Sequence, residues 1–337
     1  MYLRFYGLTE KPFELTPNPK FLFQTPGHRE ALAQLIYGTQ EQKGFMLMTG
    51  EVGTGKTTLL RALAQRLNGK AECAFVINST LAFDELLEYA LADLGVADPG
   101  GSRAQRLMAL NRFLIGQHRA GRQTILIIDE AQNLRTEALE QIRLLSNFET
   151  GSGKLLQIIL AGQPELGTKL QQPELRQLKQ RIALRCRLQP LSEDEIEQYI
   201  MNHFRVAGAR DLQPFTAAAI RQIARYSGGI PRVVNMVCDH SLLIGYANQA
   251  RQIDVDTARK AIQYLEDGTS SEAWKPAGRR LFPRPVIWAA GGIVGGMAVL
   301  ATIVSLGGYR PGWNAMPWTV VAGLGGVVRW LMHWWGS

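Results

Sequence analysis

Short apolar runs alternate with helical patterns through the middle of the chain. The runs are FMLMT at 45–49, CAFVIN at 73–78, TILIID at 124–129, LLQIILAG at 155–162 and IALRCRL at 182–188. Continuous apolar runs of this length, separated by helices, are typical of parallel strands that are buried on both faces. The pattern therefore predicts an α/β domain over residues 44–190, in which helical layers cover both faces of one central parallel sheet.

Helical patterns alone continue after this region. Their ranges are 192–207, 215–226, 231–247 and 255–265. Ser192 followed by Glu195 forms a capping box, and Pro231 suits a first helical turn. We expect a smaller all-α domain over residues 191–266. Residues 1–43 are a lead-in, whose prolines break the first part into extended and turn segments before a helix near 28–42.

The C-terminal end has a different composition. A linker at 267–285 is rich in Gly, Ser, Pro and basic groups, and residues 286–306 then carry no charge. As a helix, this run would span roughly 31 Å, the thickness of a bilayer core. Arg279, Arg280 and Arg284 precede it, which predicts a transmembrane helix with its N-terminal side in the cytoplasm. A buried core helix is the alternative.

A second apolar segment, 318–335, contains four tryptophans and Arg329. It predicts either a second transmembrane helix, which would close a hairpin, or a helix at the membrane interface. The N-terminal residues lack the apolar core of a secretory signal, so we expect the bulk of the protein in the cytoplasm and the whole at the inner membrane.

Composition changes this picture little. The chain has 337 residues, 46% hydrophobic and 20% charged, which is typical of globular proteins. Its net charge of +8 favours an anionic partner, such as nucleotide, nucleic acid or lipid, without choosing among them. Three scattered cysteines, Cys73, Cys186 and Cys238, match no metal-ligand spacing and indicate buried thiols in a reducing compartment.

The segment GEVGTGKTT at 50–58 carries the most specific chemistry. It matches G-x-x-x-x-G-K-[ST], follows an apolar run and opens a helical pattern. Lys56 would reach the β- and γ-phosphates of ATP, and Thr57 would bind Mg²⁺. The nucleotide-binding residues are then Gly50, Glu51, Val52, Gly53, Thr54, Gly55, Lys56, Thr57 and Thr58.

Two carboxylates end the apolar run ILIIDE. Asp129 would hold Mg²⁺, and Glu130 is placed to polarise the attacking water as a general base. Acidic residues also favour helix N-termini for electrostatic reasons, which is the alternative interpretation. The phosphate-binding loop upstream favours the catalytic interpretation.

Further polar residues stand at positions that suit a nucleotide site. Gln163 ends the next apolar run and could contact the γ-phosphate or the water; otherwise it is a loop glutamine. Arg232 falls in a first helical turn, where the helix dipole disfavours cations, so an anionic ligand explains it better than a surface position does. Arg181 and Arg185 could act in trans on a neighbouring subunit's γ-phosphate, or form a solvated basic face.

Together these segments resemble the AAA+ superfamily, and more closely its ExeA/GspA-like ATPases. The blocks that carry the resemblance are YGLTEKPFELTPNPKFLF, GFMLMTGEVGTGKTTLLRAL, IIDEAQNL, LAGQPEL, QLKQRI, LQPLS and SGGIPRVVN, in this order over residues 1–265. The resemblance implies a P-loop three-layer αβα sandwich followed by a helical lid. It also implies Walker A, Walker B, sensor 1 (Gln163), arginine finger (Arg181) and sensor 2 (Arg232) roles for the residues above.

The resemblance further implies assembly into a homo-oligomeric ring or filament. Secretion relatives act with envelope-assembly proteins during secretin or pilus assembly, whereas relatives similar to TnsC and TniB regulate transposition and bind DNA. We therefore expect a membrane-anchored ATPase that assembles or remodels a secretion, pilus or polysaccharide-export system. A DNA-associated ATPase that regulates transposition is the alternative, and a nucleotide-binding scaffold with little hydrolysis is a third possibility.

Overall fold

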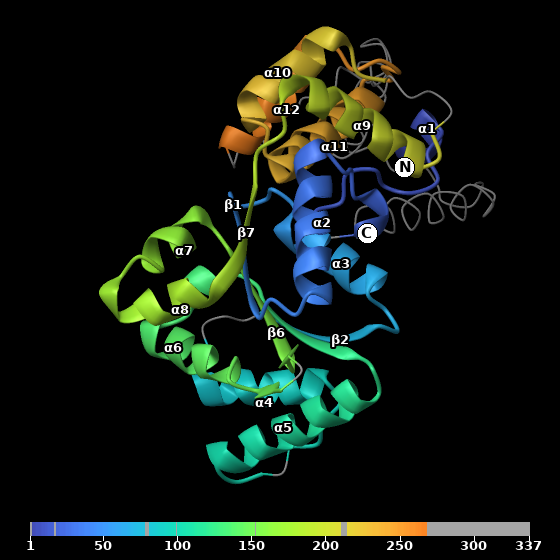
Figure 1. Cartoon of the computed structure of the whole chain (residues 1–337). Helices are drawn as coiled ribbons and strands as arrows, with labels where there is room; N and C mark the ends of the chain where they lie inside the picture. Colours follow the sequence, from blue (N-terminus) through green and yellow to red (C-terminus); the bar gives the residue numbers. More distant parts are fainter. Residues whose placement is uncertain are drawn as a thin grey trace, which may run out of the picture. The chain divides into compact units, whose positions relative to one another are not determined.

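A five-stranded parallel sheet organises the larger part of the protein (Figure 1). The computed structural model describes residues 2–16, 18–77, 81–98, 100–151, 153–209 and 214–267. The strand order is β2-β3-β6-β1-β7. The strands are β1 (Phe45–Gly50), β2 (Ala71–Val76), β3 (Gln123–Ile128), β6 (Leu156–Gly162) and β7 (Ile182–Leu188). All five predicted strands are present, and the predicted parallel α/β fold is confirmed.

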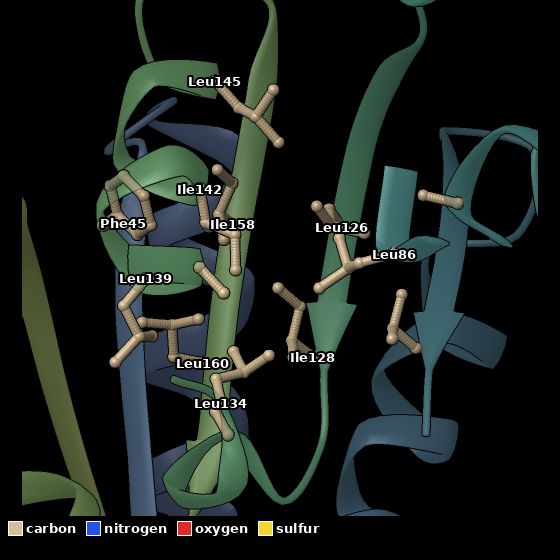
Figure 2. Close-up of a cluster of buried hydrophobic side chains, with 14 of the residues drawn as sticks. Phe45, Leu86, Leu126, Ile128, Leu134, Leu139, Ile142, Leu145, Ile158 and Leu160 are labelled. Carbon is tan, nitrogen blue, oxygen red and sulfur yellow. The ribbon is translucent and has the colours of Figure 1, made fainter. Parts of the chain in front are cut away.

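Helices cover both faces of this sheet because successive side chains of each strand point to opposite sides. In β1, Phe45 and Leu47 face one layer, whereas Met46 and Met48 face the other. The first layer comprises α4 (Phe83–Asp93), α5 (Arg103–Arg119), α6 (Thr136–Leu145), α7 (Pro164–Lys169) and α8 (Arg176–Arg181). Figure 2 shows part of its core, in which Leu139 and Ile142 of α6 lie beside β6. The second layer comprises α2 (Pro26–Gln40) and α3 (Lys56–Arg66).

Four further helices form the helical part that follows the sheet. They are α9 (Glu193–Val206), α10 (Ala217–Ser227), α11 (Pro231–Ala247) and α12 (Val255–Asp267). The predicted capping box is present, since Glu195 N donates to Ser192 Oγ and Ser192 N donates to Glu195 Oε2. Pro231 occupies the first turn of α11, also as predicted. These local signals set the helix starts because they satisfy amides that the helix itself leaves unbonded.

The lead-in is more structured than its prolines suggest. It begins with a short helix, α1 (Tyr2–Tyr6), and the Tyr2 hydroxyl donates to Asp239 of α11 at 2.6 Å. Tyr2, Leu8 and Phe13 are buried in the core of the helical part. The first residues of the chain and its last described helices therefore share one core, which no local sequence pattern indicates.

Two kinds of short element were not predicted from the sequence. A hairpin of β4 (Glu149–Thr150) and β5 (Gly153–Lys154) precedes β6, and 3-10 turns lie at Pro19–Phe21, Ala131–Asn133 and Pro173–Leu175. Segments of two or three residues are too short for a detectable apolar period.

The predicted membrane segments, 286–306 and 318–335, lie outside the described residues, as does the linker after Asp267. Asp267 itself ends α12. Within the described part of the chain, every helix is too short or too polar to cross a bilayer.

Candidate functional site: a nucleotide pocket between sheet and helical lid

The phosphate-binding loop, the acidic pair and Gln163 meet at the carboxyl edge of the sheet. The phosphate-binding loop follows β1, Gln163 follows β6 and Asp129 follows β3. Because β6 lies between β1 and β3, Gln163 stands between the loop and the acidic pair. Ligands of open α/β sheets bind at this edge, so the strand order alone brings three distant segments to one place.

The loop at 50–58 has room for backbone but not for extra side chains. Gly53 and Gly55 have φ angles of 79° and 94°, in the left-handed region that favours glycine. A Cβ atom on Gly50 would lie 2.8 Å from Thr54 Oγ1 and 3.0 Å from the Leu188 carbonyl oxygen. The loop leads directly into α3, whose first-turn amides have no acceptor within the helix. Such an arrangement binds phosphate oxygens through N–H groups and the helix dipole.

Lys56 points into this loop. Only 4% of its surface is exposed, and its Nζ donates to the carbonyl oxygens of Gly50 at 2.9 Å and Glu51 at 3.1 Å. Burial lowers the pKa of its ammonium group, an effect that the nearby carboxylates of Glu130 and Asp129 oppose. A phosphate chain bound in the loop would stabilise the charged form in the same way.

Thr57 and Asp129 place two side-chain oxygens next to each other. The Thr57 hydroxyl donates to Asp129 Oδ2 at 2.5 Å, and the Glu130 amide donates to Asp129 Oδ1 at 2.9 Å. Asp129 is buried, with 3% of its surface exposed. A hydroxyl and a carboxylate beside a phosphate-binding loop are the ligand types that Mg²⁺ takes together with phosphate oxygens. The donor set thus fits ATP with Mg²⁺.

Glu130 is held by two glutamines. Its backbone has a φ angle of 51°, which is uncommon for a residue with a side chain. Gln132 Nε2 donates to Glu130 Oε2 at 2.5 Å, and Gln163 Nε2 lies 3.4 Å from the same oxygen. The Gln163 amide in turn donates to Gln132 Oε1 at 3.1 Å. Gln132 was not identified from the sequence, because only the folded turn brings its side chain beside the Glu130 carboxylate.

The helical part closes the other side of the site. The Arg232 amide donates to the Gly53 carbonyl oxygen at 3.2 Å, so the start of α11 is bonded to the phosphate-binding loop. A Cβ atom on Gly53 would lie 2.6 Å from Arg232 Cβ. Arg232 lies in the first turn of α11 and lines the pocket. This is the position that its interpretation as a contact to an anionic ligand requires.

The resulting cavity has a volume of about 210 Å³. Beyond the loop, Glu130 and Arg232, its wall is formed by lead-in residues and by Tyr199 and His203 of α9. The lead-in residues include Pro12, Glu14, Leu15, Thr16, Asn18, Phe21, Leu22, Phe23 and His28. These residues were not predicted as part of the site, since they carry no phosphate-binding motif and reach it only through the shared core.

His28 joins the lead-in to the loop. Its Nε2 lies 3.3 Å from the Thr54 carbonyl oxygen, and its Nδ1 lies 2.8 Å from Thr25 Oγ1. Burial lowers the pKa of this imidazole. A neutral ring that bonds at both nitrogens fixes the distance between α2 and the loop.

The two candidate trans arginines lie elsewhere. Arg181 donates to Asn147 Oδ1 at 2.8 Å and to Ser146 Oγ at the end of α6, and Arg185 donates to the Lys179 carbonyl oxygen at 3.2 Å. Neither residue lines the cavity of its own chain. A single chain therefore does not bring them to the site.

This combination of parallel strand order, phosphate-binding loop and acidic pair is that of a P-loop nucleotide-binding domain. In agreement, residues 39–170 match the family model AAA_22, an AAA domain. Among characterised proteins, the chain is similar to General secretion pathway protein A of Aeromonas hydrophila, with 42% identity over 272 residues. The match covers 79% of this chain and 49% of that relative, so the chain spans about half of the relative's length. The resemblance identified from the sequence motifs is confirmed.

Two other relatives are more distant. ATP-dependent target DNA activator B of Escherichia phage D108 is 26% identical over 260 residues, which is 75% of this chain and 76% of that protein. The ORC2 protein of Aeropyrum pernix has a similar structure, with a TM-score of 0.61 and 17% identity over 78% of this chain and 73% of that chain. At this identity, the structural likeness shows a shared fold.

Proposed function

We propose that the protein couples ATP hydrolysis at this site to the assembly or remodelling of an envelope system for secretion, pilus formation or polysaccharide export. In this proposal, Lys56 and Arg232 contact the phosphates, Thr57 and Asp129 hold Mg²⁺, and Glu130 activates water with Gln163 beside it. Subunits assemble into a ring or filament, and Arg181 or Arg185 completes a neighbour's site.

One observation carries the ATPase part of this proposal. Thr57 lies in the first turn of α3 and Asp129 follows β3, yet their oxygens lie 2.5 Å apart beside the phosphate-binding loop. Thr57 and Asp129 would hold magnesium there, and the ion would supply charge neutralisation during phosphoryl transfer. The envelope role is supported by the similarity to General secretion pathway protein A.

Membrane anchoring is a separate part of the proposal. The uncharged run at 286–306, preceded by Arg279, Arg280 and Arg284, supports a transmembrane anchor with the ATPase domain in the cytoplasm. The second run at 318–335 would return through the membrane or lie at its surface.

Fractionation of expressing cells tests the anchor. We expect the full chain to sediment with membranes and to resist a wash with high salt, because apolar burial in lipid is not screened by ions. A variant that ends after Asp267 should move to the supernatant. Recovery of the intact protein in the soluble fraction would remove the anchor from the proposal.

The similarity to a phage target DNA activator favours a second candidate, a DNA-associated ATPase that regulates transposition. The net charge of +8 is compatible with it. This candidate predicts ATP-dependent binding to duplex DNA that weakens steeply between 50 and 200 mM salt, as phosphate contacts do. Filter binding of the purified chain to DNA, with and without ATP, decides between the two.

A further inference from the structure

The far end of the pocket has the properties of a base-binding site. The loop at 50–58 fixes the position of the phosphates, so the nucleoside must lie against the remaining wall, made by the lead-in and α9. This inference rests on the proposed function, since it assumes that the pocket binds a nucleoside triphosphate. The wall is aromatic, with Phe21 and Phe23 of the lead-in packed against Tyr199 and His203 of α9.

His203 contributes an imidazole to this aromatic wall. Its ring stacks on Phe13, with centroids 5.6 Å apart and planes 7° apart, and Tyr199 and Phe21 lie at 4.0 and 5.4 Å. Only 3% of its surface is exposed, and burial lowers its pKa to about 4. The imidazole is therefore neutral at physiological pH.

The position of the ring proton follows from one hydrogen bond. His203 Nδ1 lies 3.0 Å from the carbonyl oxygen of Tyr199, and a carbonyl oxygen can only accept. Nδ1 must therefore carry the proton, and Nε2 is left as an acceptor. None of the residues that the structure describes donates to Nε2. Aromatic rings pack against the imidazole, and His203 also lines the cavity.

We propose that His203 determines base specificity by accepting a hydrogen bond from the exocyclic 6-amino group of adenine. The 6-oxo group of guanine has no proton to donate, and its lone pairs would face those of Nε2. A buried site built to pair with an amine rejects the analogue that lacks it, because its own polar group is left unpaired. The aromatic neighbours then supply stacking without discriminating between bases.

Three nucleotides test this assignment on the full chain with Mg²⁺. ATP and GTP differ at the 6-position, and purine riboside triphosphate lacks any substituent there. We expect the wild-type protein to bind ATP roughly tenfold more tightly than either analogue in calorimetric titrations. Equal affinity for ATP and purine riboside triphosphate in the wild-type protein would overturn the assignment without any variant.

The substitution His203→Phe keeps a planar aromatic ring and removes the acceptor. We expect it to bring the ATP to purine riboside triphosphate preference close to one, with circular dichroism confirming the fold. The matched control is His240→Phe in α11, because His240 Nδ1 lies 2.8 Å from the Met236 carbonyl oxygen and its ring contacts Tyr264 at 5.2 Å, but it does not line the cavity. That variant should keep the wild-type preference.

The two levels of the proposal fail differently. If the ATPase proposal is wrong, the wild-type protein binds none of the three nucleotides. If only the role of His203 is wrong, all of them bind, and the preference for ATP is the same in His203→Phe as in the wild type and in His240→Phe.

Discussion

At the scale of single residues, the site depends on side chains that are buried and yet polar. Lys56, Asp129 and His203 are each at most 4% exposed. Polar groups in such positions are costly unless they are bonded, and here each bonds to a backbone or side-chain partner of the site. Single substitutions among the site residues should therefore affect ATP binding, hydrolysis and stability separately.

Lys56 and Glu130 should separate binding from hydrolysis. Lys56→Ala removes a direct charge contact with the phosphates, so we expect ATP affinity to fall by at least about tenfold. Glu130→Gln keeps the shape but removes the general base, so ATP should still bind while kcat falls by roughly 10²–10⁴. Titration of ATP binding and steady-state phosphate release measure the two effects. Unchanged turnover in Glu130→Gln would favour a base other than Glu130.

His203 predicts how stability depends on pH. Its folded pKa is about 4, below the value of about 6.5 in an unfolded chain. The unfolded state therefore binds more protons between these values, and stability falls as the pH drops through this window. Between pH 7 and 5 the loss should be about 2 kcal/mol. Urea denaturation at both pH values should show a smaller loss in His203→Phe than in the wild type; an equal loss would contradict the shift.

At the scale of elements, backbone hydrogen bonds connect the sheet domain to the helical part. Arg232 at the start of α11 bonds to Gly53 of the loop, and the Leu191 amide donates to the Gly229 carbonyl oxygen at 2.8 Å. The turn between α10 and α11 thus sets the position of Arg232 beside the phosphate-binding loop. Two adjacent glycines in this turn allow a controlled test.

Gly228 and Gly229 both have positive φ angles, of 55° and 79°. A Cβ atom on Gly229 would lie 2.2 Å from the Leu191 carbonyl oxygen, whereas one on Gly228 meets nothing within 4 Å. Gly228→Ala should cost about 1–2 kcal/mol from backbone strain alone. Gly229→Ala should cost roughly 2–5 kcal/mol, because a clash with backbone adds to that strain. Chemical denaturation compares them, and equal losses would contradict the close approach.

At the scale of the whole molecule, the two candidate trans arginines lie away from the site of their own chain. Arg181 and Arg185 lie outside the cavity of their own chain, and Arg181 bonds to the end of α6. The proposed assembly would let a neighbouring subunit supply the additional cation that phosphoryl transfer uses in related classes of ATPase.

Mixing two inactive variants tests this assembly. Arg181→Ala retains Glu130 but lacks the arginine, whereas Glu130→Gln retains the arginine but lacks the base. If Arg181 acts in trans, each should lose roughly 10²-fold or more in turnover, and an equal mixture should turn over several times faster than the mean of the two. No gain on mixing would assign Arg181 to bracing α6 within its own chain. The same mixture made with Arg185→Ala shows whether that residue is the donor instead.

The sequence by itself determined the five strands, the starts of α9 and α11, and the position of the phosphate-binding loop. These features depend on local rules: apolar runs, side-chain caps and glycines at fixed spacing. Only the tertiary structure decided that Gln132 holds Glu130, and that Phe13 and His203 share a core at the far end of the pocket. The first contact depends on the turn at Glu130, whose φ angle is 51°. The second joins residues 190 positions apart, which are brought together by packing that has no local period.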